Sequence, residues 1–191
     1  DANLKGNGVA NEGIVATRLG LKGIPSLAEE LQIARNLFLL EYTGGKLHIP
    51  TISTAKSVQL IKEAKAKGLN VTCSVSVHHL VLSDSRLENF DTRCKVSPPL
   101  RSEIDRLTLI DGILDNTIDM ITSDHNPIDI EYKKMEFDLA KDGTIGLETA
   151  FGALSTVLPL EKVIEKLTAG KATFGIESQS ISEGKKANFS I

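Results

Sequence analysis

The stretch LNVTCSVSV at residues 69–77 decides the fold. Its β-branched residues alternate with small polar ones, which is typical of a strand. Gly68 stands directly before it and ends a helix that is predicted to begin at Ser53 or Thr54 and to run to about Lys67. A helix that returns directly into an apolar strand is the repeating unit of a parallel sheet.

The same unit recurs on both sides of this stretch. Further strands are predicted at residues 46–52 and 118–122, and further helices at 26–43 and 102–114. Strands that alternate with helices, without hairpin signals, predict a parallel α/β sheet. We expect the three strands to be parallel neighbours with the helices on one side. The periodicity fits a doubly wound sheet and a segment of a barrel equally well.

The remaining segments are predicted from composition. Residues 1–24 are rich in glycine and asparagine and are predicted to be a loop. Ser26 is the expected N-cap of the next helix, with Glu29 as its capping-box partner. A charged loop is expected up to Gly143, followed by helices near 147–157 and 160–169. The chain has no initiating methionine and ends as a strand begins, so we expect a fragment: a main domain over 1–175 and a truncated strand segment over 176–191.

Composition excludes several classes of function. The net charge is −3, whereas a nucleic-acid-binding domain usually carries a basic surplus. No apolar run reaches the roughly 18 residues of a membrane span, so neither nucleic acid nor membrane is an expected partner. The two cysteines, Cys73 and Cys94, form no CxxC pair and are expected to be free thiols, which favours a cytoplasmic protein.

Chemistry-bearing side chains gather where the predicted strands end, as they do in parallel α/β enzymes. The three groups are His48 with Thr51, the pair His78-His79, and Asp124-His125. Asp124 follows an apolar run and is placed to bind a metal or act as a general base, or else to cap the following turn. Adjacent histidines diverge on an extended backbone, so at most one of the pair points into a site. We expect His48 and His79 to be packed structural residues.

Arg101 follows Pro98-Pro99-Leu100 at the start of a predicted helix. Its guanidinium could bind an anionic substrate, or it could form a structural ion pair. No P-loop, dinucleotide glycine motif, nucleophile elbow or catalytic Cys-His set is present in the sequence.

Taken together, these segments resemble the dihydroorotase family of cyclic amidohydrolases. The match extends over nearly the whole chain and includes LGLKGIP at 19–25, Ala28-Glu29, Ala34-Arg35, Ser53-Thr54, Ala64-Lys65, Val71-Thr72, His78-His79-Leu80, PPLR at 98–101, the stretch from Asp119 to His125, and GLET at 146–149. The resemblance implies the second half of a metal-dependent (β/α)8 barrel, a TIM-like fold. It also implies zinc as the cofactor and the reversible opening of dihydroorotate in pyrimidine biosynthesis as the reaction.

The resemblance also implies departures at the site. The family's paired first-strand histidines, its bridging carboxylate and a further histidine lie upstream of this chain. Of the metal-site residues within range, Asp124 is kept, and in the family it is also the general base. The remaining ligand histidine falls on Thr51, since the family pattern His-x-x-His-x-Ser reads HIPTIS at 48–53. Among the substrate-binding positions, Arg101 is kept, the asparagine before Pro-Pro is Ser97, and the histidine four residues after the aspartate is Ile128; the proline before His-His is Val77.

We therefore expect a dihydroorotase-like protein that binds no zinc tightly and is inactive as this chain. Such relatives serve as structural partners, for instance of aspartate transcarbamoylase, and a homo-oligomer is a further expectation. The opposing hypothesis is an active zinc-dependent dihydroorotase or other cyclic amidase, completed by upstream sequence and acting on a small molecule of the dihydroorotate type. An intact upstream His-x-His would favour that enzyme.

Overall fold

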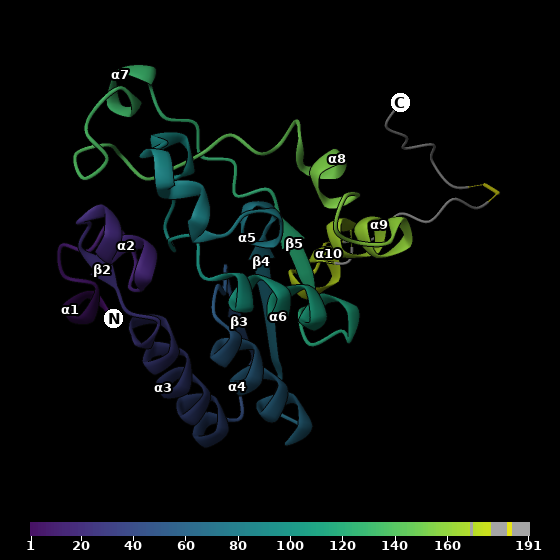
Figure 1. Cartoon of the computed structure of the whole chain (residues 1–191). Helices are drawn as coiled ribbons and strands as arrows, with labels where there is room; N and C mark the ends of the chain where they lie inside the picture. The colour runs from purple at the N-terminus through teal and green to yellow at the C-terminus, as the bar shows by residue number, and fades with distance from the viewer. Residues whose placement is uncertain (169, 177–182, 185–191) are drawn as a thin grey trace.

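The structure is a computed structural model that describes residues 1–168, 170–176 and 183–184. Its centre is a parallel sheet of three strands, β3 (Leu47–Ile49), β4 (Val71–Ser76) and β5 (Met120–Thr122), in the order β3-β4-β5 (Figure 1). Leu47 is in register with Val71, and Ser74 with Met120. The predicted parallel arrangement of these three strands is confirmed.

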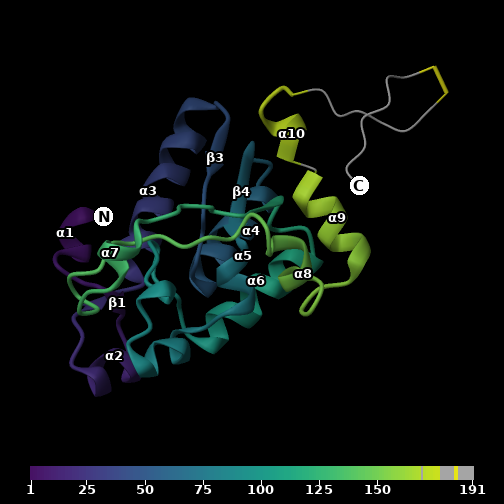
Figure 2. The same ribbon diagram turned by 90° about the horizontal axis from the view of Figure 1, so that it is seen from above.

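Three helices form the layer that covers one face of this sheet. They are α3 (Leu27–Thr43), α4 (Ala55–Ala66) and α6 (Glu103–Leu114), and α4 packs between the other two (Figures 1 and 2). α9 (Leu160–Thr168) packs against β5 and α6. The core between the layers combines alternate strand residues with apolar residues of the helices: Val71, Cys73, Val75, Ile121, Leu37, Leu40, Val58, Ile61, Leu109 and Ile113.

The opposite face of the sheet is more polar, because side chains alternate along a strand. It carries His48, Thr72, Ser74 and Ser76, and the first two are neighbours in register. The Nδ1 atom of His48 lies 2.9 Å from Oγ1 of Thr72. In a closed barrel this face would be the interior.

The start of α4 follows the predicted capping chemistry, the start of α6 has a cap that the sequence analysis does not predict, and the start of α3 lacks the predicted one. Thr54 caps α4 by accepting from the backbone N–H of Ser57, and Ser102 forms a reciprocal capping box with Asp105 on α6. Ser26 makes no side-chain cap on α3. The expected capping-box role of Glu29 is therefore wrong: its carboxylate accepts instead from the N–H and hydroxyl of Ser53 at the start of α4.

Residues 1–24 are not the predicted loop. They contain α1 (Ala2–Lys5), α2 (Ile14–Leu19) and a second parallel pair, β1 (Ala10–Asn11) with β2 (Gly23–Ile24). The strands are two residues long, which is too short to produce a periodic pattern. The segment after β4 is also a helical turn, α5 (Val77–Val81), and is followed by the 3-10 turns η1 (Asp84–Asn89) and η2 (Thr92–Cys94).

The C-terminal part is helical where it was predicted to be, with shorter elements. α8 (Ala150–Leu154) lies inside the helix predicted at 147–157, and α9 lies inside 160–169. The charged loop contains one turn, α7 (Ile130–Lys133), and α10 (Gly170–Thr173) follows α9. Most of the strand segment expected at 176–191 lies outside the described residues. No helix among the described residues is long and apolar enough to span a membrane.

Candidate functional site

The three strands deliver Thr51, His78 and Asp124 to one edge of the sheet, because parallel strands end on the same side. Two of these residues have a left-handed backbone: φ is 50° at Thr51 and 45° at Asp124. Such values are uncommon outside glycine, and for a β-branched residue they are outliers. Backbone strain of this kind gathers at functional positions, so the edge is the candidate site.

His78 and Asp124 face one another across this edge. The Nε2 atom of His78 lies 3.6 Å from Oδ2 of Asp124, and the side chains are 8 % and 37 % exposed. This separation is too long for a hydrogen bond, and Nε2 is the one buried side-chain polar atom without a hydrogen-bond partner among the described residues. Burial lowers the pKa of His78 to about 4, although the Asp124 carboxylate opposes that shift. The imidazole is therefore neutral near pH 7, which is the form that binds metals.

His79 is packed as the sequence analysis expected. It is 2 % exposed, and its Nε2 lies 3.2 Å from the carbonyl oxygens of both Pro98 and Pro99. Because carbonyls only accept, Nε2 carries the proton, and Nδ1 accepts from the hydroxyl of Ser76 at 2.6 Å. Burial, and then the neighbouring His78, lower the pKa of His79 to about 3. This histidine is fixed as a neutral structural group.

The sequence assigns no individual role to His78, which the structure places beside Asp124. The family resemblance points to Asp124 and Thr51 as metal positions, and of the adjacent histidines only His79 is predicted to be a packed structural residue. The prediction that the two side chains diverge rests on an extended backbone and is wrong here: residues 77–81 form the one-turn helix α5, and the rings of His78 and His79 lie 4.6 Å apart between centroids. The Pro98 and Pro99 carbonyls hold His79, and α5 places His78 beside Asp124.

His48 lies deeper on the polar face of the sheet and not beside Asp124. It is half-buried, and its ring makes an edge contact with Phe174 at a centroid distance of 5.2 Å. Its hydrogen-bond partner is the hydroxyl of Thr72, a side chain and not the backbone. Burial lowers the pKa of His48. These contacts describe a packed residue.

The remaining predicted site residues lie in different surroundings. Arg101 is 3 % exposed, and its guanidinium donates to Ser53 Oγ, Asn11 Oδ1 and the Ile24 carbonyl, with Glu29 at 3.9 Å. These contacts match the structural alternative for Arg101, and its substrate-binding role stays a prediction. Ser97 is exposed, with Lys5 Nζ 3.5 Å from its hydroxyl, and Ile128 is half-buried.

The residue after Asp124 ties the site to a returning loop. His125 Nδ1 accepts from the backbone N–H groups of Gly146 and Leu147, each at 3.3 Å. Asn126 N–H also donates to the Thr144 carbonyl at 2.9 Å. The two ends of the connection 125–147 are thus joined beside Asp124.

The capacity of this edge for a metal is limited to two side chains. Within the described residues no group of three or more His, Cys, Asp and Glu side chains is arranged to hold a metal ion. His78 and Asp124 have the donor types that suit zinc, and the unpartnered Nε2 of His78 fits a ligand role. A metal at this edge would need its other ligands from elsewhere.

The parallel α/β sheet and the groups at its carboxyl edge are those of a TIM-barrel amidohydrolase, and this chain corresponds to part of such a barrel. Dihydropyrimidinase from Brevibacillus agri shares the fold with a TM-score of 0.73 at 24 % identity over 80 % of this chain and 36 % of its own. L-hydantoinase from Arthrobacter aurescens gives a TM-score of 0.73 at 27 % identity, covering 81 % and 36 %. An inactive dihydroorotase-like domain of a CAD-like multifunctional protein from Chaetomium thermophilum gives 0.57 at 25 %, covering 77 % and 42 %.

Sequence comparison identifies dihydroorotases as the relatives of this chain within that class. The chain is 44 % identical to dihydroorotase from Pelotomaculum thermopropionicum over 198 residues, which cover 100 % of this chain and 46 % of the relative. It is 50 % identical to dihydroorotase from Caldanaerobacter subterraneus over 158 residues, covering 83 % and 37 %. No family model matches. The chain belongs to the dihydroorotase family and spans about half the length of the curated relatives it matches.

Proposed function

We propose that this chain forms one wall of a dihydroorotase-like hydrolase site whose metal set is depleted, so that the chain alone neither holds zinc tightly nor opens a cyclic amide. The observation that carries this proposal is the set of side chains at the carboxyl ends of the three strands. Thr51 stands where the family resemblance implies a histidine, and a threonine hydroxyl is a poor zinc ligand beside imidazole. Asp124 is kept from the family's set, and His78 lies beside it as a second donor. Two ligands are fewer than the three that catalytic zinc sites take from protein.

The roles of the remaining residues follow from their chemistry. His78 and Asp124 would hold the metal, and zinc, when bound, would lower the pKa of a coordinated water. The Asp124 carboxylate is partly exposed and could accept a proton at Oδ1 or Oδ2. Ser97 and Ile128 stand at positions where the resemblance implies Asn and His, so the substrate loses polar anchors that would orient it.

A second candidate function is an active zinc-dependent cyclic amidase whose other ligands come from outside this chain. The unpartnered Nε2 of His78 favours it. A buried nitrogen without a hydrogen bond costs about 1–3 kcal/mol, and a metal ion would remove that cost. The relatives named dihydroorotase make a substrate of the dihydroorotate type the first to test.

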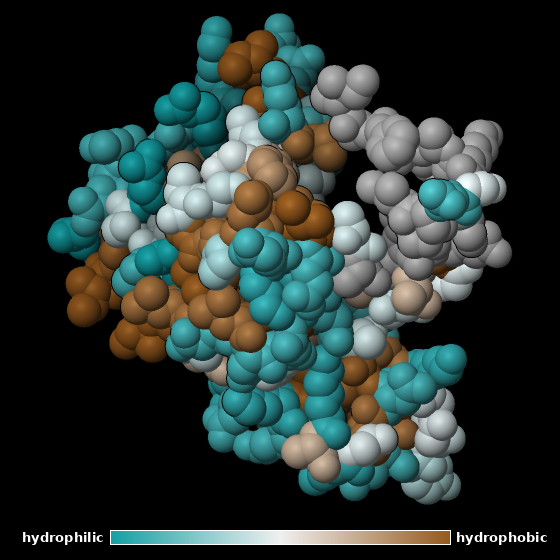
Figure 3. Space-filling view, turned by 90° about the vertical axis from the view of Figure 1, so that its right-hand side faces the viewer, coloured by the Kyte–Doolittle hydropathy of each residue, from teal (hydrophilic) through white to brown (hydrophobic). Residues whose placement is uncertain are grey.

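Partner binding belongs to the same proposal. Apolar side chains are exposed on the side that carries α8 and α9 (Figure 3), including Phe151, Leu160 and Ile164, each 50 % exposed. Exposed apolar surface of this kind is typical of interfaces. Aspartate transcarbamoylase or a second copy of the protein is the partner we would test, in the reducing cytoplasm that the free thiols of Cys73 and Cys94 suit.

The deciding experiment measures zinc content and activity together on the full-length protein. After zinc is added and the excess removed, we expect less than one equivalent bound and no ring opening or closure of dihydroorotate above background. One equivalent of zinc with clear turnover would support the active candidate instead. Zinc without turnover would place the defect at Ser97 and Ile128.

A further inference from the structure

Two lysines are buried between the loop 125–147 and the segment 92–95. Lys95 is 5 % exposed and Lys133 is 8 % exposed. No ion pair among the described residues includes either ammonium group. A buried charge is costly unless every donor is satisfied, so the partners of these two groups must compensate for the lost water.

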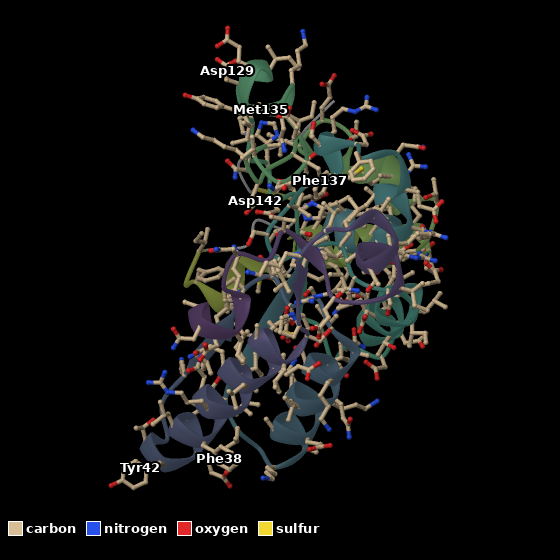
Figure 4. The ribbon with its side chains drawn as sticks, turned by 60° about the vertical axis from the view of Figure 1, so that its left-hand side comes forward. Phe38, Tyr42, Asp129, Met135, Phe137 and Asp142 are labelled. Atoms are coloured by element: carbon tan, nitrogen blue, oxygen red, sulfur yellow. The ribbon has the colours of Figure 1, made fainter. Side chains whose placement is uncertain are left out.

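The compensation comes from backbone carbonyls. Lys95 Nζ lies 2.7, 3.0 and 2.6 Å from the carbonyl oxygens of Phe137, Asp138 and Ala140. An ammonium group has three donors, so this set satisfies it completely. Figure 4 shows Phe137 at the base of the loop, with Asp129 and Met135 farther out toward its tip.

Lys133 reaches from the loop 125–147 back to the segment 92–95. Its Nζ donates to the carbonyls of Thr92 at 2.9 Å, Lys95 at 3.3 Å and Lys141 at 2.8 Å. The Gly143 N–H donates to the Lys95 carbonyl at 2.9 Å as well. Each segment therefore sends one buried ammonium group into the other, an arrangement that we call the lysine clamp (Lys95 and Lys133).

Both clamped segments lead directly to the candidate site. The segment that holds Lys95 continues to Pro98 and Pro99, whose carbonyls accept from His79, the neighbour of His78. The loop that holds Lys133 begins directly after Asp124. Its far end returns to His125, whose Nδ1 accepts from the N–H groups of Gly146 and Leu147. The clamp thus joins the support of His78 to the support of Asp124.

We propose that Lys95 and Lys133 are positioning residues that fix the separation of His78 and Asp124 by holding these two segments together. The inference deepens the proposed function and rests on it where metal binding is concerned. Neither lysine touches the reacting groups, so each acts through the backbone. Partners that orient metal ligands typically change metal affinity by about 10- to 100-fold when they are removed.

The test uses the full-length protein with Lys95→Met and Lys133→Met, which keep the chain length and remove the charge. Lys134→Met is the matched control, because Lys134 is the exposed neighbour of Lys133. The first measurement is hydrogen exchange at the amides of Asn126, Gly143, Gly146 and Leu147. We expect at least about tenfold faster exchange there in both clamp variants, no change in α4, and wild-type behaviour in Lys134→Met.

The second measurement is zinc affinity by competition with a chelator. We expect about tenfold weaker binding in the clamp variants than in wild type and Lys134→Met. If the wild type binds no zinc, as the proposed function allows, the exchange data alone decide the clamp. Unchanged exchange at these amides, or an equal rise in α4, overturns the inference. If both Met variants fail to fold, Thr92→Val, which loses only the hydroxyl donated to the Lys133 carbonyl, must show a smaller rise confined to the same amides, and no rise overturns it.

Discussion

The imidazole of His78 and the carboxylate of Asp124 meet at 3.6 Å although they follow different strands, β4 and β5. The parallel register of Ser76 with Thr122 brings the two strand ends level. No described residue forms a hydrogen bond to His78 Nε2. If a metal binds at this edge, as proposed, the change in energy should be centred on this pair.

Replacing His78 by Leu should have opposite effects on stability and on metal binding. The change removes a buried nitrogen that lacks a partner, so metal-free protein should be unaffected or more stable by up to about 1 kcal/mol. The weak zinc binding that the proposed function leaves to this edge should be lost. Urea unfolding and zinc titration of the same full-length variant test both halves.

His79→Leu is the matched comparison for that variant. It leaves the Ser76 hydroxyl and the Pro98 and Pro99 carbonyls without their partner. We expect a loss of about 2–4 kcal/mol. Equal destabilisation by the two substitutions would show that His78 is held by bonds of similar strength, contrary to the geometry.

Acid should destabilise the protein through these two histidines. Both have a folded-state pKa below the ordinary value of 6.5, about 4 for His78 and about 3 for His79. At acid pH the unfolded chain therefore binds more protons than the folded chain. The contribution of the two histidines to the free energy of unfolding is complete above pH 6.5 and is lost as pH falls through 4 and then 3. For His78 the total is roughly 3 kcal/mol. Unfolding free energies from pH 7 to pH 4 should fall less steeply in His78→Leu, whereas exposed His125→Asn should retain the wild-type slope.

Glu29 should prove to be a strong contributor to stability, although it was predicted to cap a different helix. Its carboxylate accepts from the Ser53 N–H at 2.8 Å, the Thr54 N–H at 3.3 Å and the Ser57 hydroxyl at 2.7 Å, at the N-terminus of α4. Glu29→Gln should cost about 1–3 kcal/mol. Glu30→Gln, one residue along α3, should change the unfolding free energy by less than about 0.5 kcal/mol.

The sequence predicted the parts of the fold that repeat and missed those that depend on distant backbone. The strand at 69–77 and the start of α4 at Thr54 follow from local sequence pattern. The lysine clamp does not, because the acceptors of Lys95 and Lys133 are carbonyls, which any residue supplies. Asp124 was found as a strand-end carboxylate, whereas His78 depends on which of two adjacent rings the Pro98 and Pro99 carbonyls take.

Restoring histidine at two of the substituted family positions, Thr51 and Ile128, should restore activity if these two losses caused inactivity. Thr51→His adds a ligand at the end of β3, where φ is 50°. Histidine tolerates this left-handed backbone better than β-branched threonine, so stability should not fall. Ile128→His returns a polar anchor for the substrate.

In the full-length protein we expect Thr51→His alone to raise bound zinc toward one equivalent without turnover, and the double variant to open dihydroorotate measurably. Ile128→His alone should gain neither, because it adds an anchor without a metal ligand. Turnover in the unaltered protein, or none in a zinc-loaded double variant, would show that these two substitutions do not determine activity.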